Sequence, residues 1–170
     1  TISQQLAKLL YSPPSDGLID RALKKPIEWV IAVHLERYYT KDEIINLYLS
    51  QFDFLNNAVG IQSAAQVYFN KKPQELTIEE SATLVGMCKN PSYYNPVRKK
   101  AYERTKLRRN TVLEQMEKYN YITKQECDSL KKLEMTTDFR RADHKDGLAP
   151  YIREYLRMIM TAKQPERSNY

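Results

Sequence analysis

Three Thr-x-x-Glu sequences constrain this chain most, because each is a signature of a helix start. In such a capping box the threonine hydroxyl accepts a hydrogen bond from the amide three residues on, and the glutamate reaches back to the threonine amide. The boxes lie at residues 40–43, 77–80 and 123–126, and apolar residues at three- and four-residue spacing follow each one. Only 4 glycines occur in 170 residues, which is little turn material for a β-sandwich or a Gly-rich nucleotide fold. The sequence therefore predicts an all-α fold.

Other helices are expected from about residue 58 to residue 68 and, as one long helix, from about residue 99 to residue 120. Pro26 favours a helix that begins or kinks at that point, because proline is tolerated in the first turn. From residue 134 to residue 147 the sequence is charged and aperiodic, which indicates a linker. We predict one domain over residues 1–133, followed over residues 134–170 by a linker and the start of a further connection.

Net charge is concentrated in one stretch. The chain carries +6 overall, and RKKAYERTKLRR, residues 98–109, alone holds seven Lys or Arg and one Glu. Such a stripe fits nucleic acid, an anionic membrane surface or an ordinary solvated helix face, and a non-catalytic scaffold or binding module is the alternative to an enzyme. No nucleic-acid recognition motif accompanies the charge, so we expect no nucleic-acid partner.

Glu28 is the main candidate for chemistry. It sits in an otherwise apolar run, and Lys24 and Lys25 lie four and three residues before it on the same helix face. A carboxylate held among apolar side chains beside ammonium groups can be partly desolvated and tuned for function. A plain surface ion pair explains the same residues and is the commoner interpretation of such a pattern.

The first ten residues, TISQQLAKLL, supply a second set of polar groups. Ser3, Gln4, Gln5 and Lys8 offer hydrogen-bond donors and one positive charge, which suit an anionic leaving group such as pyrophosphate. They include no base suited to catalysis at neutral pH. His34 and His144 stand alone, so no metal site is expected from the chain itself.

Four segments, in order, resemble the peptidoglycan glycosyltransferase domain of class A penicillin-binding proteins. TISQQLAK resembles that family's S-T-I-T-Q-Q-L-x-K-N, and residues 24–51 resemble its R-K-x-x-E helix followed by Y-S-K-x-x-I-L-E-x-Y-L-N. NNAVGIQSAAQVYFNK resembles G-x-x-G-I-x-x-A-A-x-x-Y-F-G-K, and NPSYYNPVRK resembles P-x-x-Y-N-P. Together they cover residues 1 to about 100.

The resemblance implies a lysozyme-like all-α domain that polymerises glycan strands from lipid II, with inversion at the anomeric carbon. Glu28 matches a family glutamate that orients substrate and stabilises the leaving group. Lys25 and Lys8 match family lysines that face pyrophosphate, and the resemblance places further substrate-binding residues at Gln4, Gln5, Lys24 and Ser3. Lys24 stands where the family usually has Arg. The lysine keeps the positive charge but lacks the two parallel N–H donors with which a guanidinium binds a phosphate.

The family's E-D-x-x-F-x-x-H-x-G motif, which carries the general base, is absent from this sequence. We expect it upstream of residue 1, in which case this N-terminally truncated chain is itself inactive or nearly so. The resemblance further implies lipid II and a nascent glycan strand as partners, and a transpeptidase domain in the same full-length chain. It also implies a location at the outer face of the bacterial cytoplasmic membrane. No cofactor is required from this chain, and Mg²⁺ or Mn²⁺ is expected only as an ion bound to the pyrophosphate.

Overall fold

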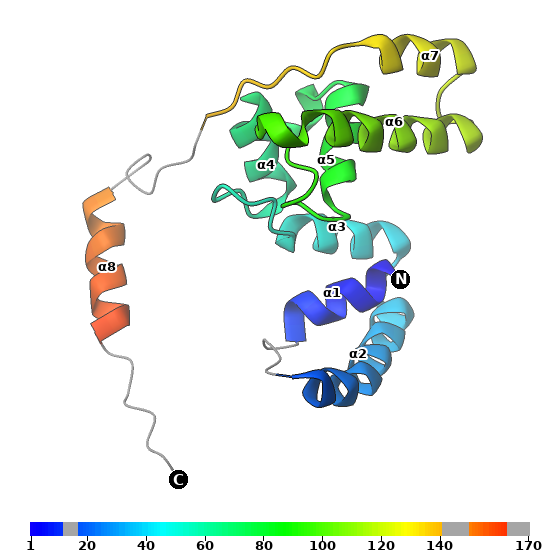
Figure 1. Cartoon of the computed structure of the whole chain (residues 1–170). Coiled ribbons are helices and arrows are strands. Elements are labelled where there is room, and N and C mark those ends of the chain that lie inside the picture. The colour runs from blue at the N-terminus through cyan, green and yellow to red at the C-terminus, as the bar shows by residue number, and fades with distance from the viewer. Residues whose placement is uncertain (12–16, 141–149, 163–170) are drawn as a thin grey trace.

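The computed structural model describes residues 1–11, 17–140 and 150–162, and those ranges are helical nearly throughout (Figure 1). In chain order the helices are α1 (Ile2–Tyr11), α2 (Leu18–Tyr38), α3 (Lys41–Gln51), α4 (Gly60–Phe69), α5 (Ile78–Met87), α6 (Tyr102–Lys118), α7 (Lys124–Lys132) and α8 (Pro150–Ala162). Short 3-10 turns cover Pro73–Glu75 and Lys99–Ala101. The same ranges hold no β-strand, only an isolated bridge between Asp53 and Val59. The all-α prediction is confirmed.

The three capping boxes start α3, α5 and α7 as predicted. At α3 the Thr40 amide donates to Glu43 Oε2 at 2.8 Å, and the Glu43 amide donates to Thr40 Oγ1 at 3.3 Å. The bond from the Thr40 amide, and after it the bond from the Thr40 hydroxyl to Glu43 Oε2 at 2.9 Å, lower the pKa of Glu43. At α7 the Thr123 amide donates to Glu126 Oε2 at 2.8 Å. Local sequence alone therefore sets where these helices begin.

Two predicted helix starts differ from the structure. At Pro26 the alternative of a helix start is wrong, because α2 begins at Leu18 and holds the proline in its interior, while the alternative of a kink stays a prediction. The continuous helix expected from residue 99 is instead a 3-10 turn over Lys99–Ala101 followed by α6, because the Ala101 backbone bonds to Arg98 in a tight turn at 2.8 Å. In the first case helix packing overrides a local preference of proline.

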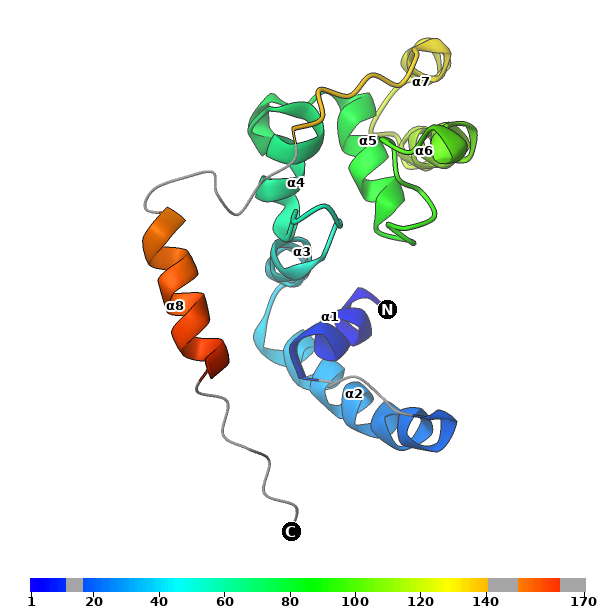
Figure 2. The same ribbon diagram turned by 60° about the vertical axis from the view of Figure 1, so that its left-hand side comes forward.

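Helix α3 joins two apolar clusters. One cluster lies where α1 and α2 meet α3 and contains Leu6, Ala7, Leu35, Ile44 and Tyr48. The larger cluster lies among α4, α5 and the loop before α4, with Phe54, Tyr68, Leu84 and Met87 fully buried. Leu49 and Phe52 pack against both clusters. In Figure 2 α3 accordingly lies between the α1–α2 pair and α4.

The loop between α3 and α4 returns on itself. Phe54 N donates to Ala58 O at 2.9 Å, and three consecutive residues, 55–57, have positive φ. Tyr68 on α4 fixes the loop, because its hydroxyl donates to Phe54 O at 2.7 Å and accepts from Asn56 Nδ2 at 2.9 Å. Burial raises the pKa of Tyr68, so this hydroxyl keeps its proton for donation. Tyr68 therefore holds this loop against α4.

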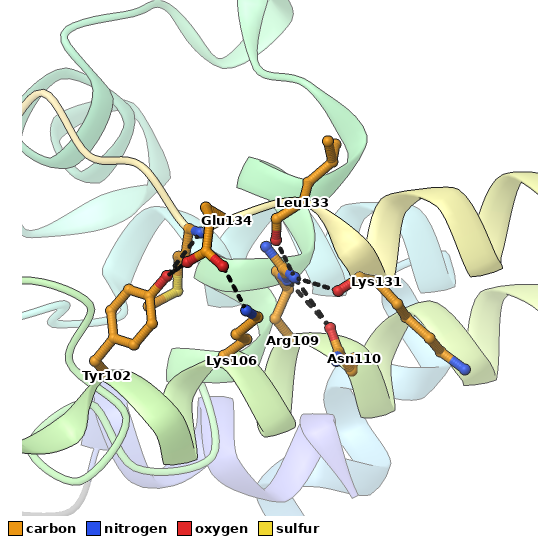
Figure 3. Close-up of polar contacts among 8 residues, drawn as sticks. Tyr102, Lys106, Arg109, Asn110, Lys131, Leu133 and Glu134 are labelled. Carbon is orange, nitrogen blue, oxygen red and sulfur yellow. Dashed lines mark hydrogen bonds and ion pairs between the residues drawn. The ribbon is translucent and has the colours of Figure 1, made fainter.

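Residues 133–140, called here the exit segment, contain no helix and run from α7 past α6 toward α4 (Figure 1), and Figure 3 shows the contacts of Leu133 and Glu134 with α6. Arg109 of α6 is 1% exposed, and its Nη2 donates to Leu133 O at 2.9 Å and to Lys131 O at 3.3 Å. Glu134 accepts from Tyr102 Oη and, at 3.1 Å, from Lys106 Nζ. The Tyr102 hydroxyl in turn accepts from the Met135 amide at 3.1 Å.

The far end of the exit segment is attached to α4. Arg140 N donates to Val67 O at 2.8 Å, and the Phe139 ring lies 5.8 Å from the Tyr68 ring. The first seven residues of the expected linker therefore belong to the packed body, while residues 141–147 lie outside the described residues. The predicted domain boundary at residue 133 itself stays a prediction. Helix α8 stands apart from the other helices in both views (Figures 1 and 2).

Gly60 generates a stability prediction. Its φ is +81°, and a Cβ added there would lie 2.6 Å from the Ser50 carbonyl oxygen. We expect Gly60→Ala to lower the free energy of unfolding by about 2 kcal/mol, because backbone strain and a clash with main chain act together. Gly17→Ala is the matched control, since that glycine has extended backbone and an added methyl group would meet nothing within 4 Å. Urea unfolding checks both variants, and equal losses would contradict the assignment.

Candidate active site

Glu28 lies on the buried face of α2, in register with Ala32 and Leu35. Its side chain is 5% exposed, while its sequence neighbours Ile27 and Trp29 point outward and are more than half exposed. The helix thus turns a carboxylate inward and apolar groups outward, the reverse of an ordinary amphipathic pattern. A buried carboxylate is stable only when it is paired and hydrogen-bonded. The buried Glu28 carboxylate therefore needs a cation and hydrogen-bond donors close to it.

Lys25 supplies that pairing. Its Nζ lies 2.8 Å from Glu28 Oε2, one helical turn earlier. The lysine side chain is 51% exposed and that of Glu28 is 6% exposed, so the pair spans the boundary between interior and surface. An ammonium group held in this way has further N–H donors to offer to an anion. Lys24, beside it, is half-buried.

The candidate residues of α1 are tied to two other helices. Ser3 is buried, and its hydroxyl donates to Glu36 Oε1 on α2 at 2.6 Å. Gln5 Oε1 accepts from the Tyr48 hydroxyl on α3 at 3.0 Å, which leaves the amide NH₂ of Gln5 as a donor. Gln4 is half-buried, and Lys8 is exposed in the last turn of α1. The structure thus joins Lys25 to Glu28 directly and fixes Ser3 and Gln5 through other partners.

Glu36 and Tyr48 are partners of candidate site residues that the sequence did not predict. Each forms a hydrogen bond with a residue more than 30 positions away in the sequence, so no short-range sequence pattern predicts the contact. Ser3 and Glu36 line one pocket of about 500 Å³ together with Lys41, Tyr39 and Ile44. Glu36 is itself exposed and lies eight residues after Glu28, so its position on α2 gave no signal of this contact.

Burial raises the pKa of Tyr48 to about 12, with a smaller contribution from Cys88. The hydroxyl therefore stays protonated at every physiological pH and remains a donor to Gln5. Its ring packs at a tilt against that of Phe52, with ring centroids 5.4 Å apart. Through this bond, α3 fixes the orientation of a candidate substrate-binding side chain on α1.

Neither a metal centre nor a membrane-spanning helix occurs in the part of the chain that the structure describes. No three His, Cys, Asp or Glu side chains come together there in a way that could hold a metal ion. The expectation about metals stays a prediction. None of the helices within the described ranges has both the length and the hydropathy needed to cross a bilayer.

Comparison with known proteins gives a consistent result. The Transglycosylase family matches residues 1–117. Penicillin-binding protein 1A of Escherichia coli (strain K12) is 36% identical over 160 residues, which are 94% of this chain and 18% of that protein. Penicillin-binding protein 1F of Bacillus subtilis (strain 168) is 39% identical over 127 residues, 75% of this chain and 17% of that protein.

A solved structure agrees with the fold. The crystal structure of penicillin-binding protein 1A from Haemophilus influenzae superposes with a TM-score of 0.52 at 27% identity, over 98% of this chain and 20% of that one. The chain therefore spans about a fifth of the length of the relatives that it matches. The all-α architecture expected from the sequence is also the architecture of this matched region.

The Tyr48 hydroxyl generates a pH prediction. Above about pH 10 an ordinary tyrosine of the unfolded chain releases its proton, while folded Tyr48 keeps its own to a pKa of about 12. The folded state then binds more protons, so stability falls as pH rises through this window. We expect the melting temperature of the wild type to fall more steeply there than that of Tyr48→Phe. The phenylalanine variant should be about 1 kcal/mol less stable at neutral pH through its lost hydrogen bond.

The control for this measurement is Tyr121→Phe, since Tyr121 is 79% exposed. It should follow the wild-type curve at every pH. Parallel curves for the wild type and Tyr48→Phe between about pH 10 and pH 12 would show that Tyr48 does not hold its proton in the folded state.

Proposed function

The chain belongs to the transglycosylase family of the class A penicillin-binding proteins, and we propose that it carries the leaving-group side of a peptidoglycan glycan polymerase. The reaction transfers the growing glycan from its lipid pyrophosphate to the 4-hydroxyl of lipid II, with inversion at the anomeric carbon. Lipid II and the nascent strand are the proposed substrates. The observation that carries this proposal is the buried Glu28 carboxylate paired at 2.8 Å with the half-exposed Lys25 ammonium.

Direct displacement at an anomeric carbon develops negative charge on the departing pyrophosphate. Donors that are already positioned where this charge forms lower the barrier most, because they do not have to reorganise during the reaction. In this proposal Glu28 fixes the Lys25 ammonium with one of its three N–H groups engaged, and the other two face the pyrophosphate. Glu28 orients and balances the lysine and is not the proton acceptor.

Helix α1 completes the anion site in this proposal. Lys8 adds a second ammonium group, and the amides of Gln4 and Gln5 add neutral donors that bind phosphate oxygens without excess charge. Lys24 contributes charge from α2. Ser3 acts through Glu36, since its hydroxyl donates to that carboxylate at 2.6 Å and so fixes the start of α1 on α2.

The base for the attacking hydroxyl is not assigned to any residue of this chain. We place it in the family motif E-D-x-x-F-x-x-H-x-G, which residues 1–170 do not contain, and expect residues 1–170 alone to have little or no polymerase activity. Mg²⁺ or Mn²⁺ would enter with the pyrophosphate. The whole enzyme would work at the outer face of the cytoplasmic membrane, with a transpeptidase domain in the same polypeptide.

A chimeric enzyme tests these roles. Residues 1–140 of this chain, which include Lys131 and the exit segment, replace the corresponding segment of the Escherichia coli relative, and glycan polymer is measured from fluorescent lipid II. We expect Glu28→Gln, Lys25→Ala and Lys8→Ala each to lower the rate by about 100-fold or more, the size of effect seen when one positioned donor to developing charge is removed.

A second lysine–glutamate pair provides the matched control. Lys131 Nζ lies 2.9 Å from Glu114 Oε1 on the α6–α7 face. Glu114→Gln, which lies inside the exchanged segment, should leave the rate within about twofold, as expected for a surface ion pair. Normal activity of all three site variants would refute the assignment. A chimera that binds a lipid pyrophosphate analogue but makes no polymer, with or without the substitutions, would favour a non-catalytic scaffold.

A further inference from the structure

A pocket of about 370 Å³ lies between the loop after α5 and α6. Its wall contains Lys89, Arg104 and Arg108, the rings of Tyr93 and Tyr94, and no carboxylate. We propose that this arginine–tyrosine pocket binds the phosphate headgroup of an anionic phospholipid. The proposal concerns a site separate from Glu28 and does not depend on the polymerase reaction.

Arg108 is held in place by the close packing of α5 against α6. A Cβ on Gly86 of α5 would lie 3.2 Å from Arg108 Cγ, so the glycine leaves room for the arginine stem. The guanidinium carbon lies 6.0 Å from the centre of the Tyr94 ring. Arg108 Nε is buried and finds no acceptor within the described ranges. One donor of Arg108 thus has no acceptor, and because Arg108 lines the pocket, its terminal nitrogens are the donors that an anion in the pocket would meet.

Arg104 is positioned by Tyr93. Its Nε donates to the Tyr93 carbonyl at 2.7 Å, and its guanidinium carbon lies 4.3 Å from the centre of the Tyr93 ring. The two tyrosine rings meet edge to face, with centroids 4.9 Å apart, so the wall that orients both arginines is itself ordered. One edge of Arg104 is engaged, and its terminal nitrogens have donors to spare.

The two arginines lie four residues apart on α6 and therefore share one face. Like charges at this spacing repel each other. An anion bound between the two arginines attracts both of them and so offsets their mutual repulsion. A phosphate group suits the pair best, since its oxygens accept the forked donors of guanidinium groups and a third oxygen can reach Lys89.

The rim of the pocket favours a phospholipid as the source of the phosphate. Leu107 lies between the arginines in sequence and is 66% exposed, and Tyr93 is 50% exposed. An apolar and aromatic rim around cationic groups suits the interface of a bilayer, where chains and headgroups meet. Without the buried Arg109, residues 98–108 still hold six Lys or Arg and one Glu, which complements an anionic surface.

Co-sedimentation of the 170-residue chain with phosphatidylglycerol–phosphatidylcholine vesicles tests the proposal. The double variant Arg104→Gln/Arg108→Gln should bind about 30-fold more weakly, which corresponds to two charges at about 1 kcal/mol each. Lys89→Gln should bind about fivefold more weakly on the same basis. Because Lys89 is exposed, this second variant tests the pocket without disturbing the packing of α5 on α6.

The control variant also removes two positive charges, but at the opposite end of α6. Lys118 also lies near a tyrosine, 5.8 Å from the ring centre of Tyr119, and Lys124 starts α7. The helical rise places Lys118 about 21 Å from Arg104, beyond a Debye length at physiological salt. Lys118→Gln/Lys124→Gln should therefore bind within about twofold of the wild type.

Three results would overturn the proposal. Equal losses for the pocket and control variants would mean that binding follows net charge. No binding to phosphatidylglycerol vesicles above that to pure phosphatidylcholine would exclude a lipid headgroup. Binding of soluble inositol hexakisphosphate that is abolished by Arg104→Gln/Arg108→Gln, without any vesicle binding, would assign the pocket to soluble phosphates instead.

Discussion

The arrangement of α2 depends on one buried charge. Glu28 is 5% exposed, and a carboxylate buried to that degree destabilises the fold unless a cation and hydrogen bonds compensate it. Lys25 does this from one turn away, at the cost of presenting Ile27 and Trp29 to the outside. A sequence selected only for stability would put the apolar residues inward. This local inversion is confined to the stretch around Glu28, because Ala32 and Leu35 further along α2 are buried in the usual way.

The position of the site depends on α3, which contacts both apolar clusters. Tyr48 packs with Leu6 and Ile44 on one side, and Phe52 reaches Phe54 on the other, with ring centroids 4.9 Å apart. The hydroxyl of Tyr48 adds a directional bond to Gln5. Apolar packing thus determines how closely α1 lies against α3, while single hydrogen bonds determine how the polar side chains of α1 are oriented.

The sequence predicted the features that are decided within a few residues. The starts of α3, α5 and α7 follow from capping boxes whose partners are three residues apart. The Lys25–Glu28 contact was likewise visible because it lies within one helical turn. The start of α2 was misplaced because Pro26 disfavours a helix interior only locally, and 21 residues of helix packed on α1 override that preference.

What the sequence could not show are the contacts between distant segments. Ser3 with Glu36 and Gln5 with Tyr48 have no periodic signature, and Arg109 looked like one more cation of a basic stripe although it is 1% exposed. The aperiodic residues 134–140 lacked any pattern because an extended segment bonded through its backbone leaves little trace in side-chain spacing.

The attachment of the exit segment determines how force would pass between this body and whatever chain follows it. Tension applied beyond residue 140 reaches the Arg140–Val67 backbone bond on α4 first, and then the bonds of Met135 and Leu133 to α6. These anchors are spread along two helices, so a pull would load them one after another. The last of them is a buried guanidinium, which resists withdrawal because water cannot replace its partners until α6 itself is exposed.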